Sequence, residues 1–134
     1  MQRYSDKIQQ EKSVAASLKG EASMSDVELY IAQFNTAKQE RLLKIRSAVR
    51  EKFPNATERV YYGIPTVEEN GKIVTHYAAY KNHVSLNVGC ALAALLQETR
   101  PQYRYTQFTV VMPDSEPFPE DFVKEICGML RQND

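Results

Sequence analysis

The sequence predicts an α+β domain in which helices cover one face of an antiparallel β-sheet. Apolar residues recur every three or four positions from Leu42 to Phe53, which is the spacing of an amphipathic helix. From Glu58 onward the apolar period changes to two, which is typical of strands. The dipeptide Asn70-Gly71 lies between two such strands and predicts a hairpin, because type I′ turns need positive φ at both central residues. Helices, then hairpins, then a helix, a strand and a last helix indicate this fold class.

The composition is that of an ordinary globular domain. The chain has 134 residues, a one-domain length, with 43% hydrophobic and 25% charged residues. Lys and Arg together number 17, as do Asp and Glu, so there is no basic field to attract nucleic acid. The sequence contains no apolar run near the roughly 20 residues of a membrane span, and no apolar segment of a secretory signal at its start. We therefore expect a cytoplasmic protein that binds neither nucleic acid nor membrane.

The start of the chain differs from the rest. Residues 1–24 are polar with scattered apolar side chains, so we expect a loosely helical or disordered arm there. Residues 25–134 are the predicted domain. The stretch from Ser25 to Glu28 is a capping box, in which each of these two side chains accepts a hydrogen bond from a backbone amide at the helix start. The next helix ends before Pro54, because a residue that precedes proline is disfavoured in the α region.

The remaining elements follow from turn signals and periodicity. Gly63 and Pro65 are expected to break or bulge the first strand, since proline removes a ladder donor. A tight turn at Lys81-Asn82 joins the third and fourth strands. The expected strands are residues 58–62, 66–69, 72–80, 83–88 and 103–112, and the expected later helices are residues 89–99 and 119–131.

The turn at Lys81-Asn82 also predicts which side chains share a face of the sheet. It places Tyr80 opposite His83, and side chains alternate between faces along each strand. The predicted core face carries Ile73, Thr75, Tyr77, Ala79, Val84, Leu86 and Val88. The other face carries His76, Ala78, Tyr80, His83, Ser85 and Asn87. In this register the two histidines lie roughly 13 Å apart, so they cannot bind one metal ion together.

Two charged clusters and two cysteines complete the candidate residues. The second helix is basic, with Lys38, Arg41, Lys44, Arg46, Arg50 and Lys52. We expect these side chains to be solvated, and an anion or partner patch is the alternative. The last loop and helix start are acidic, with Asp114, Glu116, Glu120, Asp121 and Glu125. Carboxylates stabilise a helix N-terminus, and they also offer oxygen ligands to hard cations. Cys90 and Cys127 lack zinc-site spacing, so we expect reduced, packed thiols, with a single disulfide as the alternative.

Four motifs point to a family: YIAQF at residues 30–34, the pair Ile45-Arg46, YGIP at residues 62–65 and HYAAYKNHV at residues 76–84. Together they resemble the YdhG-like domain, a bacterial domain of unknown function, over about residues 26–130. The resemblance implies a frataxin-like fold, with helices on one side of an antiparallel sheet. It also implies, for some members, a role as iron chaperones that deliver Fe(II) to iron–sulfur or haem assembly.

This chain departs from the family pattern in two places. Frataxins hold iron on an acidic first helix, whereas the equivalent helix here is basic. The Ser/Gly-Lys-Gly that usually precedes the last strand is replaced by Thr106-Gln107-Phe108. The second departure indicates that an anion site at this element in relatives is lost or altered here.

Three functional hypotheses remain at this point, and none rests on a catalytic constellation, so we expect a binding protein rather than an enzyme. The leading one is carboxylate-based iron binding, with iron–sulfur or haem assembly proteins as partners and with ligands Asp114, Glu116, Asp121 and Glu125. The first alternative is a small-molecule or anion site on the open sheet face, formed by Tyr62, His76, Tyr80, His83 and Asn87. The second alternative is a homodimer through the same face, because tyrosine is enriched at interfaces.

Overall fold

The computed structural model describes residues 24–132, so nearly all of the predicted N-terminal arm lies outside the described residues. The described helices are α2 (Asp26–Ala32), α3 (Thr36–Lys52), α4 (Cys90–Thr99) and α5 (Glu120–Gln132). The described strands are β1 (Thr57–Tyr61), β2 (Ile64–Glu69), β3 (Lys72–Ala79), β4 (His83–Asn87), β5 (Arg104–Tyr105) and β6 (Thr109–Pro113). All six pair antiparallel in the order β1-β2-β3-β4-β6-β5. The predicted α+β fold is confirmed.

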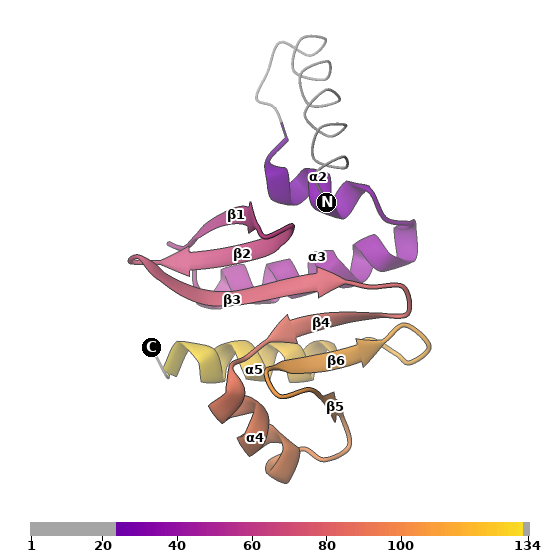
Figure 1. Ribbon diagram of the computed structural model, residues 1–134, viewed down its shortest axis with the longest axis vertical. Helices are drawn as coiled ribbons and strands as arrows, with labels where there is room; N and C mark the ends of the chain where they lie inside the picture. The colour runs from indigo at the N-terminus through magenta and orange to yellow at the C-terminus, as the bar shows by residue number, and fades with distance from the viewer. Residues whose placement is uncertain (1–23, 133–134) are drawn as a thin grey trace.

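The helices pack on one face of this sheet. Helices α3 and α5 run side by side behind the central strands, α2 lies at the β1 edge of the sheet and contacts β1 and β2, and α4 lies near the β5–β6 edge (Figure 1). No helix of the described part of the chain covers the opposite face, which we call the open face (Figure 1). Among residues 24–132, none of the helices is long and apolar enough to cross a membrane.

Side chains cap the starts of α2 and α3, and the cap of α2 is the predicted capping box. Ser25 accepts a hydrogen bond from the Glu28 amide at 3.1 Å, and the Ser25 amide donates to the Glu28 carboxylate at 2.8 Å, which completes the capping box. The Asn35 side chain accepts from the Lys38 amide and caps α3 in the same way. These caps satisfy amides that have no partner inside the helix.

The hairpins differ from expectation at their first turn. Asn70 and Gly71 have φ values of 54° and 78°, as the predicted type I′ turn requires. A second turn of this kind lies at Tyr62-Gly63, with φ values of 52° and 81°, so the first strand ends at Tyr61. Pro65 therefore does not break a strand but lies within β2. It is tolerated there because the β2–β3 ladder begins one residue later, at Thr66.

The predicted register of β3 and β4 is correct, with one local exception. The Tyr80 amide donates to the His83 carbonyl at 2.8 Å, and Tyr77 pairs with Leu86. Ile73 was expected on the core face but is 48% exposed. A register shift between Val67 and Glu68 adds one residue to β3, and one extra residue reverses the alternation of faces beyond it.

The single strand predicted for residues 103–112 is two short strands in the structure. The Thr106 amide donates to the Thr109 carbonyl at 2.9 Å, which reverses the chain between β5 and β6. The Thr106 hydroxyl also accepts from the amides of Phe108 and Thr109, at 3.3 and 3.1 Å. Hydroxyl side chains of this kind stabilise turns by replacing ladder hydrogen bonds with local ones.

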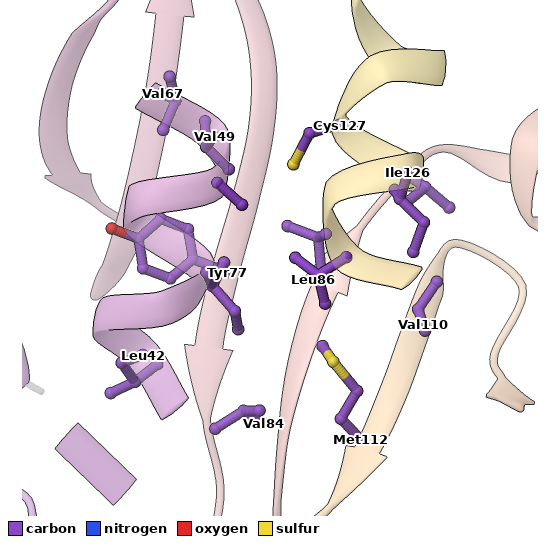
Figure 2. Packing of buried hydrophobic residues seen from close by; sticks show 14 of the residues in the cluster. Leu42, Val49, Val67, Tyr77, Val84, Leu86, Val110, Met112, Ile126 and Cys127 are labelled. Carbon is purple, nitrogen blue, oxygen red and sulfur yellow. The ribbon is translucent and has the colours of Figure 1, made fainter. Parts of the chain in front are cut away.

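The core lies between the sheet and helices α3 and α5. Leu42 and Val49 of α3 and Ile126 of α5 point toward Tyr77, Leu86, Val110 and Met112 of the sheet (Figure 2). Each fully buried side chain of this size contributes roughly 1.5–3 kcal/mol. Cys127 lies in this core, as expected, whereas Cys90 is exposed at the start of α4 and the two thiols are free.

Candidate functional site

A groove of about 230 Å³ lies on the open face of the sheet. Its floor is formed where Ala78 of β3 pairs with Ser85 of β4. Although both residues point away from the core, they are only 2% and 8% exposed. The groove is therefore hollow because two small side chains are surrounded by larger ones.

Tyrosines border the groove at the end of the sheet where the β1–β2 and β3–β4 turns lie. Tyr61 ends β1, and Tyr62 occupies the turn, with ring centroids 4.3 Å apart and ring planes at 55°. The Arg59 guanidinium lies over the Tyr61 ring at 4.4 Å. Tyr80 lies beyond the end of β3, on the same side of the sheet as Ala78. These rings give the groove an aromatic border.

A buried lysine holds the turn that carries Tyr80. The Lys38 ammonium donates to the carbonyls of Tyr80 and His83 and forms an ion pair with Asp114. The Tyr80 and His83 rings stack with centroids 4.8 Å apart. Lys38 was expected to be solvated but is 7% exposed, because α3 passes directly behind this turn.

Polar side chains line the opposite end of the groove. His76 Nδ1 lies 3.0 Å from the Thr66 hydroxyl, and burial lowers the pKa of the imidazole below its usual value. The Asn87 side-chain oxygen accepts from the Gly89 amide at 3.0 Å. Both groups are therefore held in one orientation and are uncharged at neutral pH.

The structure brings together most of the residues predicted for the open face. Tyr62, His76, Tyr80 and Asn87 line the groove, and His83 lies beside it, stacked on Tyr80. The predicted set omitted some of the lining residues, namely Tyr61, Ile64, Ala78, Ser85 and Thr109. Strand parity had already placed Ala78 and Ser85 on this face, although they were not named as site residues, whereas Tyr61 and Ile64 needed the correct position of the first turn.

The carboxylates proposed as iron ligands do not converge. Asp114 pairs with Lys38 and Arg41, Glu116 with Arg104, and Glu125 with Arg100. Asp121 is exposed in the first turn of α5. Within residues 24–132, His, Cys, Asp and Glu side chains form no group of three or more that could hold a metal ion. Asp114, Glu116 and Glu125 are instead neutralised separately, by basic side chains of α3 and of the segment between β4 and β6.

Comparison with known proteins gives a fold but no function. No protein-family model matches the sequence, and no curated protein matches it. Among solved structures, the chain is similar to a DUF1801-family protein, YdhG, from Bacillus subtilis. The two are 16% identical with a TM-score of 0.68, and the match covers 78% of this chain and 86% of that one. This likeness supports the YdhG-like fold, and the frataxin-like grouping stays a prediction.

Proposed function

We propose that this protein binds a small, uncharged organic molecule in the open-face groove and that it acts by binding rather than by catalysis. The groove over Ala78 and Ser85 is the observation that carries this proposal, since it has both a hollow and a border of aromatic rings. Small-molecule sites combine such apolar lining with a few oriented polar groups. His76 and Asn87 supply those groups.

The charge of the groove distinguishes this proposal from an anion site. Among the described residues, those that line the groove include no Asp, Glu, Lys or Arg. A phosphate or carboxylate there would lose its hydration without gaining a free positive partner, because the Arg59 guanidinium at the border already pairs with Glu68 at 3.2 Å, and such a loss is unfavourable. The imidazole of His76 is bonded to the Thr66 hydroxyl rather than to a carboxylate, so it is not arranged as an activated general base.

Amide chemical shifts of the 15N-labelled chain, recorded against a fragment collection, test the proposal. Binding is expected to shift the amides of Ala78 and Ser85 saturably. Ala78→Leu fills the hollow and is expected to abolish those shifts, whereas Ile73→Thr, an exposed change on β3 outside the groove, is expected to leave them unchanged. If a ligand bound both variants with equal affinity, its site would lie outside the groove.

The iron-chaperone role, with iron–sulfur or haem assembly partners, is supported by the family resemblance alone. It is tested by anaerobic calorimetric titration with Fe(II), with the wild type beside Asp121→Asn/Glu125→Gln. Saturable binding that the double variant weakens would support iron binding and locate it on α5. An absence of heat at millimolar iron would exclude it for this protein.

Self-association through the open face is supported by the exposure of Tyr62 and Tyr80 on one side of the sheet. Sedimentation equilibrium tests it: a dimer that Tyr80→Ser dissociates would favour this role, whereas a monomer at high micromolar concentration would exclude it.

A further inference from the structure

We infer that the ligand of the open-face groove is a planar nitrogen heterocycle with a cyclic amide edge, in which a ring N–H lies next to a carbonyl. This inference rests on the proposed function and specifies its chemistry. It follows from the two polar groups at the end of the groove, from the shape of the floor and from the neutrality of the lining.

The hydrogen bonds of His76 assign its free nitrogen as an acceptor. The Thr66 hydroxyl has one proton, which it donates to the Ile64 carbonyl at 3.3 Å. The same oxygen lies 3.0 Å from His76 Nδ1, and with the hydroxyl proton on the Ile64 carbonyl we assign Nδ1 as the donor of that bond. Nε2 then carries a lone pair and can accept a hydrogen bond from a ligand. Burial lowers the pKa of the ring, so the neutral imidazole prevails over the charged form at pH 7.

The hydrogen bond of Asn87 assigns its free group as a donor. The Gly89 amide can only donate, so the Asn87 atom that lies 3.0 Å away is the side-chain oxygen. The NH₂ group of Asn87 is therefore its remaining polar group. In the β3–β4 register, Asn87 lies opposite His76, one pair beyond Tyr77 and Leu86. Side chains opposite each other are roughly 5 Å apart at Cβ, so one small ring edge can contact both.

The complement of this pair is an edge that donates to His76 and accepts from Asn87. A cyclic amide presents these two groups on adjacent ring atoms. The groove of about 230 Å³ also suits such a ring, because a cavity of about 150 Å³ accommodates benzene. The small side chains of Ala78 and Ser85 let a flat molecule lie on the floor, and the tyrosine border offers aromatic contacts to it.

Hypoxanthine and purine are the probes for this inference, because they share one bicyclic ring and only hypoxanthine has the cyclic amide edge. Each is titrated into the 15N-labelled chain to millimolar concentration, and the Ala78 and Ser85 amides are followed. One hydrogen bond contributes about 1.4 kcal/mol here, which corresponds to tenfold in affinity. Hypoxanthine is therefore expected to bind at least tenfold more tightly than purine.

The matched variant is Asn87→Asp, which keeps an oxygen for the Gly89 amide and replaces the NH₂ donor by a second oxygen. This variant is expected to weaken the binding of hypoxanthine at least tenfold and to change the binding of purine much less. Ile73→Thr is expected to change neither affinity. His76→Phe keeps a flat ring but lacks the acceptor, so it is expected to weaken the binding of hypoxanthine by a similar factor.

The outcomes separate the two proposals. Equal binding of hypoxanthine and purine, or hypoxanthine binding unaffected by Asn87→Asp, would overturn the cyclic amide class. If fragments of another class then shifted the same amides and lost binding in Ala78→Leu, the groove would still be a ligand site. If no compound shifted those amides, both the class and the proposed function would be wrong.

Discussion

Removing the buried ammonium of Lys38 is the most direct test of how the tyrosine border is held. In the substitution Lys38→Met, the side chain keeps its approximate length and loses its charge and its donors. The wild-type ammonium bonds two carbonyls of the β3–β4 turn and the Asp114 carboxylate, which lies beyond β6. The variant therefore leaves three acceptors of two separate segments without this partner.

The magnitude follows from the burial of each group. Removing one partner of a buried ion pair costs roughly 3–5 kcal/mol. Asp114 is 31% exposed and keeps Arg41 at 3.9 Å, so water and Arg41 offset part of this cost. Each carbonyl that loses a donor adds about 1 kcal/mol, less where water reaches it. We expect the free energy of unfolding to fall by about 2–4 kcal/mol, which most domains of this size survive.

Urea unfolding followed by circular dichroism measures this loss. Lys44→Met is the matched control, because Lys44 lies on the same helix and pairs with Glu120 at 3.8 Å, with both side chains about half exposed. Such an exposed pair contributes about 0–1 kcal/mol. The double variant Lys38→Met/Asp114→Leu is expected to be more stable than Lys38→Met, because it removes the stranded charge as well.

Equal stability of Lys38→Met and Lys44→Met would refute the reasoning, since it would mean that the Lys38 ammonium is as well solvated as an exposed one. A double variant that is less stable than Lys38→Met would show instead that packing, not charge, dominates at this position.

Three further outcomes are expected. Gly71→Ala should destabilise the protein by about 1 kcal/mol in urea unfolding, because Gly71 has a φ of +78°. Gly128→Ala in α5 should stabilise it by up to about 1 kcal/mol, because the added Cβ meets its nearest atom at 3.9 Å. Changes of the same sign in the free energy of unfolding would contradict this pair of predictions. At pH 8, a thiol reagent should titrate Cys90 alone in the folded chain and Cys127 only after denaturation, because burial raises the pKa of Cys127 to about 12; two reactive thiols in the folded chain would contradict it. The pKa of His76, measured by NMR, should lie below about 6.5, and stability should fall as pH drops through that value because the unfolded chain binds the proton first; a pKa above 6.5 would refute the burial of the ring.

Much of the fold could be predicted because its signals are local. The capping box at Ser25, the turn at Asn70-Gly71 and the apolar period of α3 each depend on backbone sterics within a few residues. The face of the sheet that carries His76 and Asn87 followed from one turn position and strict alternation. The same reasoning failed at Ile73, where a register shift adds a residue and reverses the faces.

The roles of the charged residues could not be predicted in this way. Lys38 and Asp114 are 76 positions apart, and only the packing of α3 behind the sheet brings them into contact. The sequence shows a basic helix and an acidic loop, which fits solvated faces, a metal site or a salt-bridge network equally well. Which of these forms depends on the distances between elements, and charge interactions change steeply with distance and burial.

The sequence by itself thus determined the element types, the antiparallel pairing and the face on which the candidate ligand residues lie, because these depend on periodicity and turn chemistry. The tertiary structure alone decided that three of the four candidate carboxylates form separate ion pairs, that Lys38 is buried and that Ala78 and Ser85 form the floor of a groove. A hollow is a property of how neighbouring side chains surround a small one, and that arrangement is set by strands distant in the chain rather than by any local pattern.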